Sequence, residues 1–202
     1  MQDILNRLKK LSAISAYVQL YENFDKNIVL KHIGKVTGEI DRPYIDFLML
    51  TNGASVLDYC FFGMKNRNLG ANLYDNVTEL WKIDNLLTFR FWGCIGDSIG
   101  NSFGYLDKKN DSGEHYFGYH SLNSPGKVYL VASSFFVFME KFLSQIELTV
   151  AKSKAAIGLD GNDWFMDKAK LIECDKEMEI YLKDSTGTEY PLIGQCPLLD
   201  SY

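Results

Sequence analysis

The sequence predicts an α+β fold in which an antiparallel sheet packs against N-terminal helices and a closing helix, with a C-terminal extension. Three observations lead to this prediction. Apolar residues recur at three- and four-residue steps near the N-terminus, which indicates helices. Between about residues 56 and 132, aromatic and β-favouring segments are separated by turn signals. A second helical stripe begins at Phe135, and helices, then strands, then a closing helix are typical of α+β domains.

The 202 residues are expected to divide into an α+β domain over residues 1–150 and an acidic extension over residues 151–202. Hydrophobic residues make up 47% of the chain and aromatic residues 14%, enough for a large core. The extension is predicted to hold a short helix over residues 163–172 and a hairpin formed by residues 177–183 and 188–193. It contains six basic and ten acidic residues, so it carries −4 of the net charge of −5.

The N-terminal segment predicts three helices. Apolar residues from Ile4 to Tyr21 keep helical spacing, which indicates one amphipathic helix, and a second helix begins near Lys26. Pro43 suits the first turn of a third helix, for which Asp41 is a plausible N-cap. Asn-Gly at positions 52 and 53 is also a hairpin signal, but residues 46–50 do not alternate. We therefore predict a helix stop with a left-handed residue there.

The middle of the chain predicts strands over residues 56–64, 89–95, 102–107, 115–120 and 127–132. A helix is expected over residues 73–85, with Asp75 or Asn76 near its N-terminus. Turns are expected over residues 96–100, 108–114 and 124–126, where glycine, proline and small polar residues gather. Ser133 or Ser134 is predicted to cap the closing helix, which runs to about residue 154.

One motif suggests catalysis. A strand followed by Gly96-Asp97-Ser98 resembles the nucleophile block of the Gly-Asp-Ser-type lipases and esterases. A serine nucleophile needs a general base, normally a histidine, which in that family lies near the C-terminus. The last histidine here is His120, so a tight turn between strands is the better interpretation and hydrolysis is kept only as a third alternative.

The remaining candidate chemistry predicts no metal and no cofactor. His115 and His120 lie five residues apart on one predicted strand, so they face opposite sides and are expected to be partly exposed. No phosphate-binding loop is present. The cysteines are far apart and are expected to be buried free thiols: Cys60, Cys94, Cys174 and Cys196.

Charge and hydropathy limit the partners. No apolar run approaches the roughly 18 residues of a membrane helix, and the spaced apolar residues at the N-terminus do not resemble a signal peptide. We therefore expect a cytoplasmic protein with no membrane partner. No basic stripe suggests nucleic-acid binding. An acidic surface could attract a basic protein, or it could serve solubility alone.

The order of motifs resembles the SUKH superfamily of Smi/Knr-type domains. The matching segments are FLMLTNGA, LYDNVTELWKIDN, FWGCIGDSIGNSFGYLD and ASSFFVFMEKFL, and together they span roughly residues 25–147. IDRPY stands where the family usually has Leu-Pro before the Asn-Gly helix. The resemblance implies an α+β fold without catalysis. It also implies, as for bacterial members, an immunity protein that binds and neutralises a toxin, often a nuclease.

Two regions are candidate partner-binding sites, because their carboxylates could pair with basic groups around a toxin's active site. The first is a turn-rich edge with Asp97, Asn101, Asp107, Asp111 and Glu114. The second is the acidic extension with Asp163, Trp164, Asp167, Glu173 and Asp175. The alternative is a non-catalytic intracellular interaction module whose partner is not a toxin.

Overall fold

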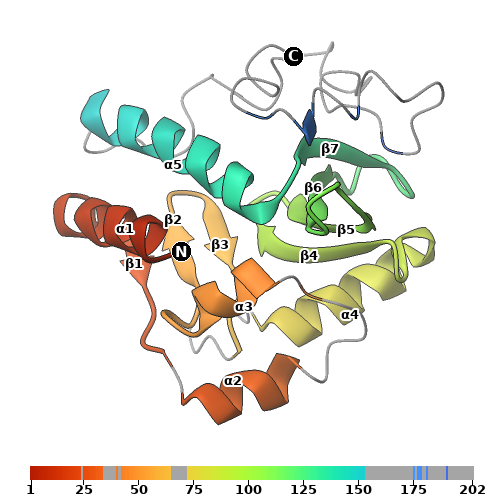
Figure 1. Cartoon of the computed structure of the whole chain (residues 1–202), viewed down its shortest axis with the longest axis horizontal. Helices are drawn as coiled ribbons and strands as arrows, with labels where there is room; N and C mark the ends of the chain where they lie inside the picture. The colour runs from red at the N-terminus through yellow and green to blue at the C-terminus, as the bar shows by residue number, and fades with distance from the viewer. Residues whose placement is uncertain are drawn as a thin grey trace.

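The computed structural model describes residues 1–23, 25–33, 40, 42–64, 72–152, 175, 177, 178, 181 and 190. Within these residues the predicted α+β class is confirmed: five α-helices accompany one seven-stranded antiparallel sheet (Figure 1). The helices are α1 (Gln2–Ile14), α2 (Lys26–Ile33), α3 (Arg42–Leu48), α4 (Leu73–Ile83) and α5 (Phe135–Lys152), with a short 3-10 helix η1 (Asn85–Leu87). The strands are β1 (Val18–Leu20), β2 (Ala54–Val56), β3 (Tyr59–Phe61), β4 (Phe91–Gly96), β5 (Ser102–Lys109), β6 (His115–His120) and β7 (Val128–Ala132).

The strand order follows the chain from β1 to β7, and every neighbouring pair is antiparallel. Such a meander places successive turns at alternate ends of the sheet. Along one end the register aligns Cys60 with Gly96, Gly96 with Ser102, Ser102 with His120, and His120 with Val128. The turns over residues 57–58, 97–101 and 121–127 therefore share this end, which we call the three-turn end. The turn after β5, over residues 110–114, lies at the opposite end.

The first predicted helix is too long. α1 ends at Ile14, Ser15 is extended with φ −134° and ψ 124°, and β1 follows, with Val18 paired to Val56 of β2. The apolar residues of β1 continue the helical spacing of α1, which explains the wrong prediction. Residues 18–20 form a strand because they pair with β2, more than 30 residues later in the chain, and periodicity cannot reveal such a pairing. Val18 is buried in this arrangement.

The Asn-Gly helix stop is confirmed. α3 ends at Leu48, and Gly53 has φ +84° immediately before β2. A Cβ on Gly53 would lie 2.2 Å from the carbonyl oxygen of Phe61, so both the backbone angle and the available space require glycine. Asn52 supports the connection, because its Oδ1 accepts a hydrogen bond from the Met64 amide at 2.7 Å.

A hairpin does occur a few residues later, where one strand over residues 56–64 was predicted. β2 and β3 form that hairpin, joined by Leu57 and Asp58, with Val56 opposite Tyr59. Leu57 adopts φ 53°, a left-handed angle that is rare for a branched residue. The turn therefore lacks the glycine or asparagine that would have identified it in the sequence.

The later elements largely agree with the predictions. β4 to β7 appear at the expected places, and β6 has the predicted bounds. α4 is capped by Asn72, whose side chain accepts hydrogen bonds from the amides of Tyr74 and Asp75, and Asp75 lies in the first turn beside this cap, as expected. Ser134 caps α5 as one of the two predicted serines, since its Oγ accepts from the Val137 amide at 3.3 Å.

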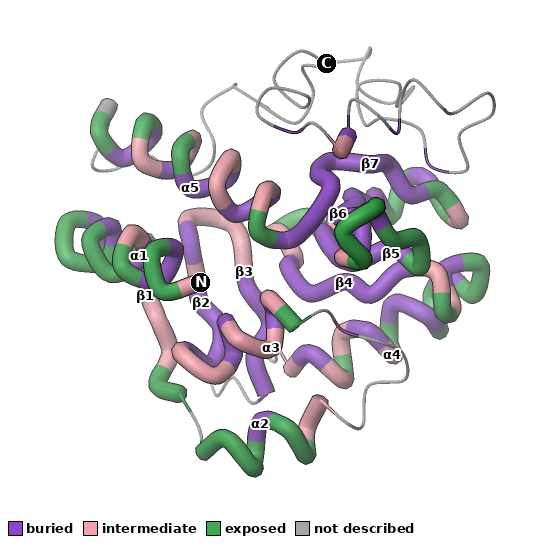
Figure 2. Tube along the Cα trace, in the orientation of Figure 1, coloured by how far each residue is buried: buried purple, intermediate pink, exposed green. Residues whose placement is uncertain are grey.

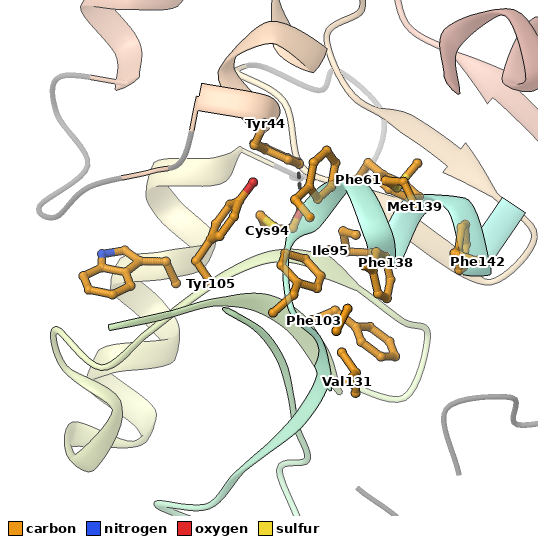
Figure 3. Close-up of a cluster of buried hydrophobic side chains, with 14 of the residues drawn as sticks. Tyr44, Phe61, Cys94, Ile95, Phe103, Tyr105, Val131, Phe138, Met139 and Phe142 are labelled. Carbon is orange, nitrogen blue, oxygen red and sulfur yellow. Dashed lines mark hydrogen bonds between the residues drawn. The ribbon is translucent and has the colours of Figure 1, made fainter. Parts of the chain in front are cut away.

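An aromatic core lies between the sheet and helices α3 and α5 (Figures 2 and 3). Phe138 of α5 packs 4.6 Å from Phe117 and 5.4 Å from Phe103, measured between ring centroids. The Tyr44 hydroxyl lies 2.6 Å from the Phe62 carbonyl oxygen and 2.8 Å from that of Cys94, the contact drawn in Figure 3. Tyr44 thereby ties α3 to β4, and its complete burial raises the pKa of its hydroxyl well above the ordinary value.

Part of the extension belongs to this core. Met178, Tyr181 and Tyr190 are buried against the domain. Glu177, Met178 and Tyr181 are helical, so the strand predicted over residues 177–183 is wrong at these three positions. The predicted helix over residues 163–172 and the second strand of the hairpin, apart from Tyr190, lie outside the described residues. No helix in the described part of the chain is long and apolar enough to cross a membrane.

Candidate interaction surface

Asp97 and Asn101 form the turn between β4 and β5. The Asp97 Oδ1 accepts hydrogen bonds from the amides of Ile99 at 3.1 Å and Asn101 at 2.8 Å. Its Oδ2 accepts from the Asn101 side chain at 2.8 Å, and the Asp97 amide donates to the Asn101 carbonyl oxygen. Asp97 is half-buried while Asn101 is buried. The two residues therefore hold the turn rigid, and the Asp97 carboxylate is fixed in place at the three-turn end.

The structure separates the residues that the sequence grouped as one turn-rich edge. Asp107, Asp111 and Glu114 lie toward the far end of β5, whereas Asp97 and Asn101 lie at its start. The eight residues of β5, at about 3.3 Å each, place the two groups on the order of 25 Å apart. The single edge is thus wrong, because consecutive turns of a meander alternate between the two ends of the sheet.

At the end with the turn over residues 110–114, Asn110 organises the backbone. Its Nδ2 donates to the Ser133 carbonyl oxygen at 3.0 Å, and its Oδ1 accepts from the Glu114 amide at 3.0 Å. Asp111 is exposed and Glu114 is half-exposed. Two predicted site residues therefore stand on a well-anchored turn.

The C-terminal segment packs against this same end. The Tyr190 hydroxyl donates to Asp107 Oδ1, and the Arg90 guanidinium lies 5.4 Å from the centre of the Tyr190 ring. The Tyr181 ring packs 5.0 Å from Tyr116 and under the Lys108 ammonium at 4.5 Å. Asp107 is thus already engaged within the chain, which reduces its availability to a partner.

These contacts also perturb the tyrosines. Burial, with smaller contributions from Glu177 and Asp111, raises the pKa of Tyr116 to about 12. Burial and the hydrogen bond to Asp107 raise the pKa of Tyr190 well above the ordinary value. Both rings therefore carry neutral hydroxyl groups at neutral pH.

Asp175 is a structural residue in this fold. It is 2% exposed, its Oδ2 accepts from the Ser133 amide at 2.9 Å, and its Oδ1 accepts from the Met178 amide at 3.2 Å. The Lys141 ammonium lies 3.4 Å from Oδ2. A buried carboxylate engaged on both oxygens cannot face a partner, so we leave Asp175 out of the interaction surface. Asp163, Trp164, Asp167 and Glu173 lie outside the described residues.

A pocket of about 480 Å³ opens at the three-turn end. It lies between the hairpin β2–β3, the start of α4 and the turn between β4 and β5. Its lining is Leu57, Asp58, Cys60, Phe62, Asn76, Gly96, Asp97, Ser98, Gly100, Asn101 and Ser102. The sequence did not identify Asp58 and Cys60 as site residues, because their hairpin was predicted as one strand.

The Cys60 thiol in this pocket is not ionised at physiological pH, because burial raises its pKa to about 11.

Ser98 lines this pocket, but none of the described lining residues is a histidine that could act as its base.

His115 and His120 were predicted to be partly exposed, and both are buried. Each uses its Nδ1 for the backbone, His115 with the Leu106 carbonyl oxygen and His120 with that of Lys127 at 3.0 Å. They are covered by packing on both faces of the sheet, which a single sequence does not reveal. Within the described residues, no three His, Cys, Asp or Glu side chains form a group that could hold a metal ion.

Three large apolar side chains are exposed on or beside the turns of the three-turn end. Ile99 is 77% exposed, Leu86 60% and Leu122 43%. Leu122 lies against Gly100, where an added Cβ would approach its Cδ1 to 2.6 Å, and Leu86 lies against Gly126 in the same way. The turn over residues 121–127 thus connects the turn that carries Ile99 to η1.

A second hollow, of about 580 Å³, lies near the N-terminus between Met1, Lys26, Arg42 and Met49. Arg42 and Asp46 on its wall are paired at 2.8 Å. Their charges compensate each other, which makes this hollow a weaker candidate for recognising a charged partner.

The sequence was compared with protein-family models and with curated proteins, and it matches none of them.

Proposed function

We propose that the protein is an immunity protein that binds a cognate, basic toxin and neutralises it by covering its active site. The proposal is supported by carboxylates held on the rigid turns of a sheet, of which Asp97 is the clearest case. A side chain fixed by three hydrogen bonds loses little entropy on binding, which favours tight association.

The charge of the chain agrees with this partner. A toxin that cleaves nucleic acid needs basic residues around its substrate channel to hold phosphate. A protein with a net charge of −5 that presents carboxylates is attracted to such a channel and can associate quickly. The order of sequence motifs, which resembles that of the SUKH superfamily, supports the same proposal.

The second candidate function is a non-catalytic interaction module with an intracellular partner unrelated to toxins. The exposed Ile99, Leu86 and Leu122 suit any protein partner and do not require a basic one. The neighbouring gene separates the two proposals, because a toxin gene directly upstream favours the immunity protein.

Co-expression tests the first proposal. The product of the adjacent reading frame is induced in a bacterial host with and without this protein, and colony survival is counted. We expect survival only in the presence of this protein, and no protection against an unrelated toxin of the same class. Equal killing with and without the protein would reject the proposal for that pair.

A further inference from the structure

We propose that the partner binds at the three-turn end of the sheet, and that a cationic side chain of the partner enters the pocket beside Asp58 and Asp97. This inference rests on the proposed function, since it specifies where and how a basic protein is held. The occupant of the surface is therefore the basic surface of another protein.

The opposite end of the sheet is already occupied by this chain. Tyr190 contacts Asp107 and Arg90 there, and Tyr181 packs on Tyr116. Asp97 lies at the other end of β5, so these described residues of the C-terminal segment do not cover the three-turn end. Among the described residues, the contacts of the C-terminal segment that involve predicted site residues therefore lie at the opposite end, at Asp107.

The three-turn end has the composition of a binding surface. Ile99 and Leu122 are exposed on two turns that approach each other at Gly100, and the exposed Leu86 lies against Gly126 of the same turn as Leu122. Isolated exposed leucines are ordinary, but several exposed apolar side chains on neighbouring turns, bordered by polar ones, are typical of interaction sites. Since these side chains lie on hairpin turns and on η1, a partner can contact them without any rearrangement of the fold.

The charges at this end favour a cation. Among the described residues that line the pocket are the two carboxylates of Asp58 and Asp97, and none of these described residues is a lysine or an arginine. Lys127 is the only basic residue in the three turns, and it lies outside the pocket lining. The two carboxylate oxygens of Asp97 accept three hydrogen bonds within the turn. Because a carboxylate offers about four acceptor positions, Asp97 can still accept a hydrogen bond from a cation.

Arginine fits this pocket better than lysine. Leu57 and Phe62 contribute apolar wall, while Asn76 and Asn101 contribute amides beside the carboxylates. A guanidinium group donates along its planar edge and packs its face on apolar or aromatic surface, whereas an ammonium group is a compact, strongly hydrated charge. The mixed lining therefore matches a guanidinium group.

A second copy of this chain is a poorer occupant. A two-fold dimer brings the same surface of both copies together. Asp58 and Asp97 of one copy would then face the same carboxylates of the other, and like charges across an interface oppose association. A basic partner removes this repulsion.

The inference is tested with the toxin encoded by the adjacent reading frame, in a catalytically inactive form, by measuring association and dissociation rates. We expect Asp58→Asn to weaken binding about tenfold, mainly through slower association and with a reduced dependence on salt. We expect Ile99→Ser to accelerate dissociation about tenfold, as for a side chain buried at an interface. The matched control Asp111→Asn, at the opposite end, should change the affinity by less than about twofold.

The outcomes separate this inference from the proposed function. If the wild-type chain binds but Asp111→Asn weakens binding while Asp58→Asn and Ile99→Ser do not, the proposed function stands and the assignment of the surface fails. If the wild-type chain does not bind, the proposed function fails for that toxin. Circular dichroism and thermal unfolding of each variant ensure that a lost affinity does not reflect a lost fold.

A measurement without any toxin tests the pocket itself. N-acetyl-arginine amide is titrated into the isotope-labelled protein, and amide shifts are followed by NMR. We expect shifts at Asp58, Ile99 and Asn101 with the arginine probe and none with its uncharged analogue, N-acetyl-citrulline amide. Equal shifts with both probes, or shifts only elsewhere, would overturn the proposed cation pocket.

Discussion

At the scale of single residues, a few side chains and backbone angles determine how the elements connect. Gly53 turns the chain from α3 into β2 with φ +84°, and Asn52 beside it binds the Met64 amide. Asp97 closes the turn between β4 and β5, and Asn110 closes the turn between β5 and β6. Each of these residues satisfies backbone groups that would otherwise lack partners at the end of an element.

Gly53→Ala should destabilise the protein strongly. The substitution combines a disfavoured backbone angle with a Cβ placed 2.2 Å from the Phe61 carbonyl oxygen. We expect a loss of about 3 kcal/mol in the free energy of unfolding, measured by urea denaturation.

Gly113→Ala is the matched control. Gly113 has φ +81°, but nothing lies within 4 Å of the position of an added Cβ. The loss in the free energy of unfolding of this variant should come from the backbone angle alone and amount to about 1 kcal/mol. Equal losses in the two variants would mean that the close approach of β3 to Gly53 contributes nothing to stability.

At the scale of elements, the C-terminal segment is fastened to the domain through Asp175. This carboxylate accepts from the Ser133 amide just before α5 and pairs with Lys141 inside α5. Met178, which follows one helical turn later, is completely buried. The segment therefore contributes to the same core as α5, and Asp175 is the polar link between them.

Asp175→Ala should destabilise the fold and leave the proposed interaction surface intact. Lys141 would lose the carboxylate it pairs with at a site where its side chain is 12% exposed, and we expect a loss of about 3 kcal/mol by urea denaturation. The exposed Asp111 serves as control, since Asp111→Ala should change stability by less than about 0.5 kcal/mol. A partner affinity that falls with Asp175→Ala at temperatures where the fold is intact would contradict the structural role.

At the scale of the whole molecule, the seven-stranded meander places its turns at two opposite ends of the sheet. One end carries the contacts among Tyr116, Tyr181, Tyr190 and Asp107. The other end presents the pocket and the exposed Ile99. This division follows from the chain order of the strands, which places alternate turns at opposite ends.

The buried tyrosines predict a loss of stability at alkaline pH. The folded state raises the pKa of Tyr116 from 10 to about 12, so between these values the folded chain binds more protons than the unfolded chain. Stability is therefore fully present below about pH 10 and falls as the pH rises toward about 12. Tyr44 and Tyr190 act in the same direction.

Urea denaturation at pH 8 and pH 11 measures this effect. The free energy of unfolding should be lower at pH 11, and Tyr116→Phe should lose less than the wild-type chain over the same interval because it cannot ionise. An equal loss in both proteins would show that Tyr116 ionises alike in the folded and unfolded states.

Elements whose signals are local could be predicted from the amino-acid sequence. Ser134 caps α5 beside its own first turn, Gly53 lies in the connection between α3 and β2, and the turn residues delimit β5 and β6. Asp97, Asn101, Asp111 and Glu114 could be recognised as turn residues for the same reason. Capping, helical spacing and turn chemistry depend on neighbours within a few residues, which the sequence displays directly.

Contacts between segments that are distant in the sequence could be identified only in the folded chain. β1 forms because Val18 pairs with Val56. The buried Asp175 accepts a hydrogen bond from the Ser133 amide and pairs with Lys141. The pocket likewise needs Asp58 from one hairpin beside Asp97 from another. These contacts join residues about 40 apart, and a periodic pattern carries no information on such a partner, so burial and the assembly of the surface become visible only in the folded chain.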